Sequence, residues 1–234
     1  MSIIIHGTVV SPFVRKVFVA LEEKGIAYER VDVRPLPRTD ELFAKSPLGK
    51  IPVMEVEGTY IPDSSVICQY LERTHPSPAL YPTAPLAFAR ALFLEEYADT
   101  KVFEITTAPF FQRFVRPRIF KEEPDEPYIR EVMENELPPV LDYLSGELGD
   151  DDFLIDNQFC IADIAVCSPF VNMQTLGSEH VDAERWPKFS AYLERVLSRP
   201  AYKTAVAGLP DSKLPAGRLD RAPLRTGLPD SVRA

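Results

Sequence analysis

A serine at the start of a predicted helix is the first residue of the sequence that could do chemistry. Ser11 precedes Pro12 and follows a short apolar run that predicts a strand. The first amide groups of a helix have no partner within the helix and lie at the positive end of its dipole, so they favour a bound anion. A plain N-cap serine gives the same pattern. The two interpretations are compatible, because a hydroxyl can accept the capping bond and still donate its proton to a ligand.

A second motif, Ser46-Pro-Leu-Gly-Lys-Ile-Pro-Val53, could bind an extended ligand through its backbone. Only about one X-Pro bond in twenty is cis in folded proteins, but a proline that opens a strand after a Gly-Lys turn is a candidate. A cis bond between Ile51 and Pro52 would expose the N–H and carbonyl of Ile51 to a peptide-like ligand. Lys50 would then face a carboxylate. We predict this cis bond.

A third motif places an acid and a hydroxyl at the start of another predicted helix. Asp63 could hold an ammonium group, while Ser64 and the free amides beside it could hold a carboxylate. Together they would grip the zwitterionic end of an amino acid. Helix capping alone explains the same residue types.

The predicted elements bring all three motifs into one small α/β unit. Apolar residues at helical spacing from Val14 to Leu21 predict a helix between Ser11 and Gly25, and alternation around the glycine turn at 58–59 predicts a hairpin. The predicted strands cover residues 2–6, 28–33, 52–57 and 60–61, and two further helices cover 40–45 and 64–72. The order β-α-β-α-β-β-α predicts a domain with a mixed sheet over residues 1–75.

A proline-rich stretch follows, and only helical periodicity lies beyond it. Four prolines within residues 76–85 predict a stiff, extended linker. The spacing of apolar residues then predicts an all-α domain over residues 86–207. Its predicted helices cover residues 86–114 with a kink at Pro109, 128–148 with an interruption at Pro138 and Pro139, 161–176, 187–197 and 202–207.

The last 27 residues have a different composition from the rest. Residues 208–234 hold four prolines, three glycines and no aromatic residue. Such a segment cannot bury much apolar surface, so we predict a tail that is loosely packed or disordered.

The composition excludes several classes of function. The 234 residues include 26 basic and 35 acidic ones, a net charge of −9, without a lysine or arginine run that could hold a nucleic acid. No apolar run reaches the roughly 18 residues of a membrane span. The cysteines and histidines have neither disulfide nor metal-ligand spacing: Cys68, Cys160, Cys167, His6, His75 and His180. We expect a cytoplasmic protein without a metal and without a nucleic-acid or membrane partner.

In this order, the three motifs resemble the glutathione transferase family, in its serine-type bacterial and plant-like branch. The resemblance covers about residues 2–207. The matching pieces are Ser11-Pro-Phe-Val-Arg-Lys-Val17, Ala20-Leu-Glu-Glu-Lys-Gly25, Ser46-Pro-Leu-Gly-Lys-Ile-Pro-Val53, Asp63-Ser-Ser-Val-Ile67, Phe159-Cys-Ile-Ala-Asp-Ile164, Trp186-Pro-Lys-Phe189 and Ser198-Arg-Pro-Ala201. It implies a thioredoxin-like N-terminal domain, an all-helical second domain and a homodimer.

The resemblance also implies a role for each motif, with glutathione as co-substrate. Ser11 matches the serine that activates the glutathione thiol. The other residues implied to bind glutathione are Phe13, Lys50 at the glycyl carboxylate, Ile51 and Pro52 at the cysteinyl unit, and Asp63 and Ser64 at the γ-glutamyl end. The implied reaction is attack of the activated thiol on a small hydrophobic electrophile.

Two other functions stay open on the same fold. One is isomerase, dehalogenase or peroxidase chemistry with the same thiol, and the other is a binding or regulatory protein without catalysis. A related branch has cysteine where Ser11 stands, but thiol exchange requires a protein thiolate, so that chemistry is disfavoured here. The three cysteines are better interpreted as core residues.

The second domain adds candidates and departures. The long first helix predicted for the second domain carries Phe103, Phe110, Phe111 and Phe114, with Arg113. The resemblance implies that this helix lines the pocket for the electrophile, so these residues could form an apolar wall, although core or dimer packing explains the same helical spacing. The family usually has a glycine and a serine or threonine where this chain has Asp156 and Cys160, and a thiol caps a helix poorly. His6 stands where relatives often carry an aromatic residue, and we interpret it as a packed strand residue.

Overall fold

A four-stranded mixed sheet organises the N-terminal domain. The computed structural model describes residues 2–209. The strands are β1 (Ile3–His6), β2 (Glu29–Val31), β3 (Val53–Val56) and β4 (Thr59–Pro62), in the order β2-β1-β3-β4. Strand β1 is parallel to β2 and antiparallel to β3, which is antiparallel to β4. The predicted element order and mixed sheet are confirmed.

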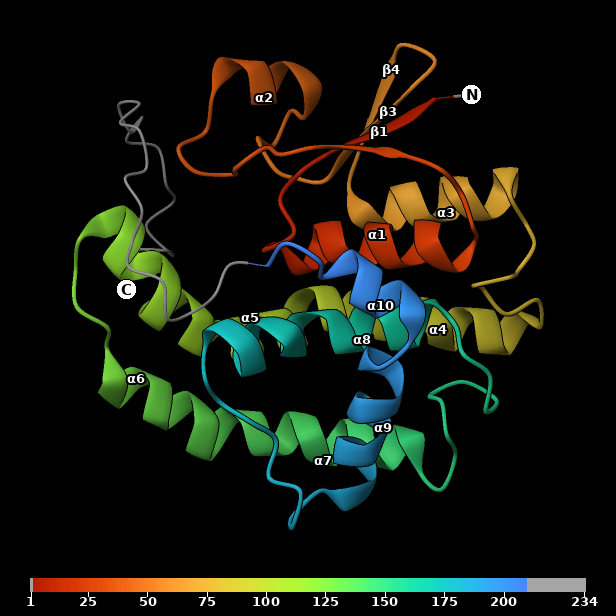
Figure 1. Ribbon diagram of the computed structural model, residues 1–234. Coiled ribbons are helices and arrows are strands. Elements are labelled where there is room, and N and C mark those ends of the chain that lie inside the picture. Colours follow the sequence, from red (N-terminus) through yellow and green to blue (C-terminus); the bar gives the residue numbers. More distant parts are fainter. Residues whose placement is uncertain (1, 210–234) are drawn as a thin grey trace.

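Helices cover both faces of this sheet. Figure 1 shows α1 (Pro12–Glu23) and α3 (Ser64–Thr74) on one face and the short helix α2 (Asp40–Lys45) on the other. Helix α1 forms as predicted, because its apolar residues Val14, Val17 and Leu21 recur at helical spacing and are fully buried. It ends at Gly25, whose φ of +65° is one that glycine adopts without strain.

The second strand is shorter than predicted. Residues 28–33 were expected to form it, but β2 covers only Glu29–Val31. It is an edge strand with all three residues exposed, so neither packing nor a second neighbour extends it. Pro35 and Pro37 follow shortly after the end of β2, and the Leu36–Pro37 bond is cis.

The second domain is entirely helical in the part of it that the structure describes. Its elements are α4 (Pro85–Tyr97), η1 (Ala98–Val102), α5 (Phe103–Phe110), η2 (Phe111–Phe120), α6 (Glu126–Glu131), η3 (Val132–Glu136), α7 (Leu137–Leu148), α8 (Ile161–Val171), η4 (Asn172–Leu176), α9 (Pro187–Leu197) and α10 (Pro200–Ala205). The η segments are π-helical turns that continue the helices before them. The helices predicted over 161–176 and 187–197 are confirmed.

Three predicted helices differ in detail from those observed. The last, expected over residues 202–207, lies over Pro200–Ala205 as α10, because Pro200 is tolerated in the first turn of a helix. The helix expected over residues 86–114 continues to Phe120, and α turns give way to π turns at Ala98 and again at Phe111. Proline has no N–H for the α-helical bond, and Pro109 stands just before the second change, so the chain shifts to wider turns instead of breaking. The helix expected over residues 128–148 contains a similar π segment, η3, directly before Pro138 and Pro139.

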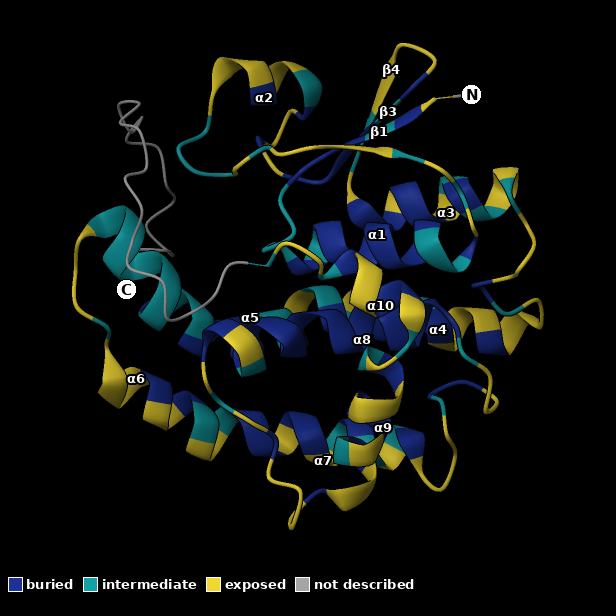
Figure 2. Cartoon of the chain, viewed as in Figure 1, coloured by how far each residue is buried: buried dark blue, intermediate teal, exposed yellow. Residues whose placement is uncertain are grey.

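Helix α8 is the centre of the molecule. All its residues are buried, and Figure 2 shows it and α1 as the darkest helices. At its start, the Asp163 carboxylate accepts hydrogen bonds from the Cys160 N–H (2.8 Å), the Leu154 N–H (3.0 Å) and the Tyr192 hydroxyl (3.0 Å). The Cys160 sulfur faces the amide of Asp163 and completes a capping box. Helix α8 packs against both α1 and α4, so it joins the two domains.

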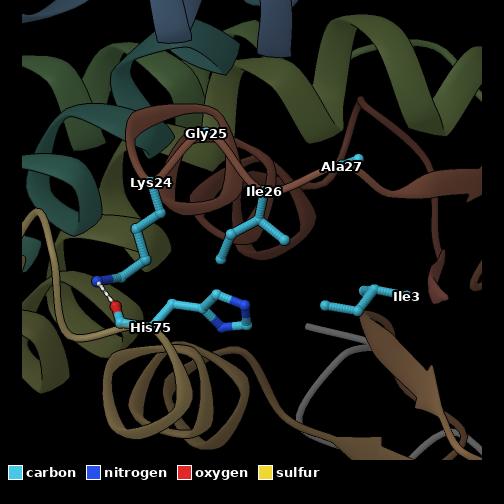
Figure 3. Close-up of a pocket in the computed structure, with 6 residues that line it drawn as sticks. All are labelled: Ile3, Lys24, Gly25, Ile26, Ala27 and His75. Atoms are coloured by element: carbon cyan, nitrogen blue, oxygen red, sulfur yellow. Dashed lines mark hydrogen bonds between the residues drawn. The ribbon is translucent and has the colours of Figure 1, made fainter. Parts of the chain in front are cut away.

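The connection between the domains is anchored by one lysine. The Lys24 ammonium donates to the carbonyls of His75 (2.7 Å) and Pro78 (2.8 Å) and lies 2.7 Å from the Glu72 carboxylate. Figure 3 shows Lys24 and His75 beside a hollow that Ile3 also lines. This lysine holds the proline-rich stretch against the end of α1.

Within residues 2–209, no helix is both long and apolar enough to cross a membrane. The described residues also contain no group of three histidine, cysteine or acidic side chains that could hold a metal ion. The predicted tail over residues 208–234 lies, from residue 210 on, outside the described residues.

Candidate functional site

The strand register brings the three motifs to one end of the sheet. His6, the last residue of β1, pairs with Val53, the first of β3, and Val53 pairs with Pro62, the last of β4. The segment from β1 to Ser11, the start of β3 after Pro52 and the segment from β4 to Asp63 therefore all lie at the same end of the sheet. The segments that carry the three motifs therefore lie side by side, at the paired ends of β1, β3 and β4.

Ser11 caps α1 as a hydrogen-bond acceptor, and its hydroxyl proton is not donated to a described residue. Its Oγ accepts the Val14 N–H at 3.4 Å, a long bond, and the side chain is half-buried. Gly7 lets the loop before Ser11 pass close to α1, since a Cβ there would lie 2.5 Å from a methyl group of Val14. The capping bond uses only an oxygen lone pair, so the proton can be donated to a ligand.

The Ile51–Pro52 peptide bond is cis, which confirms the prediction. Both residues are buried. The N–H and carbonyl of Ile51 form no hydrogen bond with another described residue. Buried backbone groups are almost always paired, so this amide and carbonyl are available to pair with an extended ligand.

Lys50 projects from a tight turn beside this bond. Its N–H donates to the Ser46 hydroxyl at 3.3 Å, and Gly49 has a φ of +59° with the Phe43 ring 2.8 Å from where a Cβ would be. The Lys50 side chain is exposed, and its ammonium contacts no acceptor among the residues the structure describes. It is therefore an exposed positive charge beside the cis bond.

Asp63 is held in a strained backbone conformation at the start of α3. Its φ is +79°, a region that costs a non-glycine residue about 1–3 kcal/mol. One carboxylate oxygen accepts the N–H groups of Ser65 (2.9 Å) and Val66 (3.2 Å), which leaves the other oxygen for a cation. The buried Ser64 hydroxyl has no hydrogen-bond partner within residues 2–209.

The structure adds an ion cluster behind Asp63 that sequence reasoning missed. The Lys16 ammonium, on α1, lies 3.0 Å from the Glu95 carboxylate, 2.5 Å from the Asp99 carboxylate and 3.0 Å from the Ser65 hydroxyl. Burial alone would lower the pKa of Lys16, but Glu95 and Asp99 outweigh it and raise that pKa above its ordinary value. Burial also raises the pKa of Asp99. The cluster joins α1, α3, α4 and η1 directly below the α3 N-terminus.

The proposed aromatic wall is only partly connected to these residues. The rings of Phe13 and Phe103 lie 4.7 Å apart, so the first motif contacts the second domain. The rings of Phe110 and Phe114 stack at 5.5 Å, and all four phenylalanines of the wall are half-buried. Arg113 instead forms ion pairs with Glu126 and Glu179, both at 2.8 Å, and is committed to holding η2 in place.

His6 and the three cysteines are core residues, as predicted. His6 is buried, with Nε2 2.9 Å from the Glu55 carboxylate. The three cysteines are free and buried, and burial raises the pKa of the Cys160 thiol to about 12 and those of Cys68 and Cys167 as well. The hollow in Figure 3 lies beyond the last turn of α1, at the opposite end from Ser11, and belongs to no part of this site.

Comparison with known proteins identifies two family domains in the chain. Residues 5–79 match the family described as "Glutathione S-transferase, N-terminal domain", and residues 100–200 match "Glutathione S-transferase, C-terminal domain". A probable glutathione S-transferase of Nicotiana tabacum is 30% identical over 193 residues, which covers 80% of each chain. Glutathione S-transferase omega-1 of Mus musculus is 30% identical over 145 residues, 60% of this chain and 56% of the mouse protein.

A solved structure supports the fold over most of the chain. The glutathione S-transferase of Methylobacterium radiotolerans, crystallised in complex with glutathione sulfonate, is 26% identical with a TM-score of 0.74. The similarity covers 94% of this chain and 100% of that one.

Proposed function

The chain belongs to the glutathione S-transferase family, and from this we propose that it activates the thiol of glutathione for attack on a small hydrophobic electrophile. One observation carries the proposal. One end of the sheet brings together three features. They are a serine hydroxyl whose proton is not donated to a described residue, a backbone amide and carbonyl beside a cis proline, and an acid followed by a second hydroxyl. That amide, that carbonyl and the second hydroxyl have no hydrogen-bond partner among the described residues.

Ser11 is proposed to stabilise the thiolate as a hydrogen-bond donor, as in the serine-type branch of the family. A net hydrogen bond to a charged acceptor contributes about 1.5–3 kcal/mol, which would lower the thiol pKa from about 8.5 by roughly one to two units. Thiolate then becomes a major form near neutral pH. The protein supplies activation and orientation, and the thiolate sulfur forms the new bond to the electrophile.

The other motif residues are proposed to hold the rest of the tripeptide. Ile51 pairs through its backbone with the cysteinyl unit, and the exposed Lys50 ammonium reaches the glycyl carboxylate. The free oxygen of Asp63 takes the γ-glutamyl ammonium. Because the amides of Ser65 and Val66 are already used by Asp63, the γ-glutamyl carboxylate falls to the unpaired Ser64 hydroxyl. The glutathione sulfonate complex of the bacterial relative supports this class of ligand.

The electrophile is proposed to bind against Phe13 and Phe103, whose contact links the thiol site to the helical domain. We also propose a cytoplasmic homodimer. Apolar side chains exposed on α3 and α4 support a second copy there: Val66 (52% exposed), Leu86 (75%) and Phe93 (54%).

Two measurements test the function. Glutathione titration by calorimetry measures binding, and the rate with an aryl halide measures conjugation. Ser11→Ala is expected to raise the pKa of the bound thiol by about one to two units and to lower the conjugation rate at neutral pH by about tenfold or more. Ser198→Ala is the matched control, because the Ser198 hydroxyl donates to the Arg195 carbonyl (2.9 Å) at the end of α9, in the helical domain. Unchanged thiol pKa and rate in Ser11→Ala would reject Ser11 as the activator.

The alternatives are separated by substrate. A panel of aryl halides, epoxides and hydroperoxides distinguishes conjugation from isomerase, dehalogenase and peroxidase chemistry. Binding of glutathione without turnover of any of them would favour a regulatory protein. The absence of binding would reject the proposed function altogether.

A further inference from the structure

Two consecutive cations of α1 are buried, and the groups around them differ in charge. Lys16 faces two carboxylates, as described above. Arg15, 0% exposed, forms no ion pair with a described residue. Its Nη1 donates to the Val9 carbonyl at 2.8 Å, and its Nη2 donates to the Ser168 carbonyl at 2.6 Å and to the Asn172 amide oxygen at 2.5 Å.

Asn172 completes a bridge between the domains at the loop that leads to Ser11. Its Oδ1 accepts from Arg15, and its Nδ2 donates to the Val10 carbonyl at 2.9 Å. The carbonyls of Val9 and Val10, the two residues before Ser11, are therefore both held by side chains. One of these side chains comes from α1 and the other from η4 of the helical domain.

The groups around the Arg15 guanidinium are neutral. Ser168 on α8 contributes its carbonyl and Asn172 on η4 its amide. Among the described residues, Tyr202 on α10 is the titratable group whose charge would act on Arg15. Burial raises the pKa of Tyr202 well above the usual value, so it carries no charge at neutral pH. Burial lowers the pKa of Arg15 to about 10, which still leaves it protonated at neutral pH. The Arg15 Nε has no partner at all within the described residues.

We propose that Arg15, held by Asn172, positions the loop that carries Ser11 and supplies an uncompensated positive charge that favours the thiolate bound there. Arg15 and Asn172 are positioning residues that touch neither glutathione nor the electrophile. The electrostatic role rests on the proposed function, because it needs a bound thiolate. The positioning of the loop does not depend on that function.

The size of the effect follows from the distance. A guanidinium hydrogen-bonded to a carbonyl two residues before Ser11 lies within roughly 10 Å of it. At that distance, an uncompensated charge in a protein of effective dielectric constant about 20 shifts the pKa of an anion by about one unit. A neighbouring carboxylate would cancel most of this shift.

The test is a pair of substitutions at Asn172. Asn172→Asp is nearly isosteric and places a negative charge against Arg15. It should raise the pKa of the bound glutathione thiol by about one unit. Asn172→Ala removes both hydrogen bonds without adding a charge, and it should raise that pKa less. The thiolate is followed by its ultraviolet absorbance during a pH titration of the saturated protein. The control is Thr106→Ala, because the buried Thr106 hydroxyl has one hydrogen-bond partner among the described residues, the Val102 carbonyl (2.7 Å).

Hydrogen exchange supplies a readout that does not need glutathione. The Ser11 N–H donates to the Thr8 carbonyl at 3.0 Å, and this amide should exchange at least tenfold faster in Asn172→Ala but not in Thr106→Ala. An unchanged thiol pKa in a folded Asn172→Asp variant would overturn the electrostatic role, and unchanged exchange in Asn172→Ala would overturn the positioning role. If the wild-type chain binds no glutathione, the proposed function fails, and the exchange measurement alone decides the fate of the bridge.

Discussion

Replacing Lys16 by methionine removes the cation from the buried ion cluster. Lys16 is 1% exposed and its ammonium has three partners within 3.0 Å. Methionine preserves much of the side-chain volume but leaves the carboxylates of Glu95 and Asp99 without a positive charge. Breaking a buried ion pair in this way costs about 3–5 kcal/mol. For a chain of this size, that predicts a fall in Tm of about 6–20 °C.

The loss of stability in Lys16→Met should be smaller at lower pH. Burial already raises the pKa of Asp99, and without Lys16 it rises further. A carboxyl whose pKa is higher in the folded than in the unfolded state destabilises the fold as pH rises through the folded value. Lowering the pH from 7 to about 5 should therefore protonate this group and narrow the difference in stability between Lys16→Met and the wild-type protein.

Thermal unfolding followed by circular dichroism at several pH values measures both effects. Lys101→Met is the matched control, since Lys101 is 41% exposed and pairs with Glu104 at 3.6 Å and Glu136 at 3.5 Å. Such surface pairs contribute about 0–1 kcal/mol, so its Tm should fall by less than about 4 °C. The reasoning is refuted if Lys16→Met loses no more stability than Lys101→Met, or if its deficit stays constant between pH 7 and 5.

Two smaller substitutions test local features. Cys160→Ser should raise the Tm by a few degrees, because a hydroxyl accepts the hydrogen bond from the Asp163 amide better than a thiol does. Such a cap contributes about 1 kcal/mol, and a lower Tm would reject this prediction. Gly7→Ala should cost about 1–3 kcal/mol and weaken glutathione binding, because its Cβ would lie 2.5 Å from a methyl group of Val14 and displace the loop before Ser11. Wild-type Tm and Kd in Gly7→Ala would show that the loop adjusts freely.

Local signals were sufficient for the elements near the site. The Ser11 cap, the helix Asp40–Lys45 and the cis bond before Pro52 are each determined largely by residues a few positions apart, and each was predicted. The meeting of the motifs at one sheet edge depends on the register of β1, β3 and β4, which the sequence pattern does not specify.

The buried cations could not be predicted from the sequence. Arg15 and Lys16 are types that usually face solvent, and their partners lie 79 to 157 residues away in the chain, at Glu95, Asp99 and Asn172. Only the packing of the helical domain onto α1 reveals that this side of the helix is buried. The aromatic wall was uncertain for a related reason, since helical spacing alone does not distinguish a ligand pocket from core packing.

The burial of α1 on all sides also limits how this protein can evolve. The apolar core of the protein is one continuous cluster that runs from Ile3 in the first strand to Ala205 in the last helix. A helix that is shared in this way cannot be exchanged as part of a separate module, because a new N-terminal half would need the same buried cations opposite Glu95 and Asn172. We expect substitutions on α1, α4 and α8 to become fixed in compensating pairs, so that the two halves of the chain diversify together while the exposed helices vary independently.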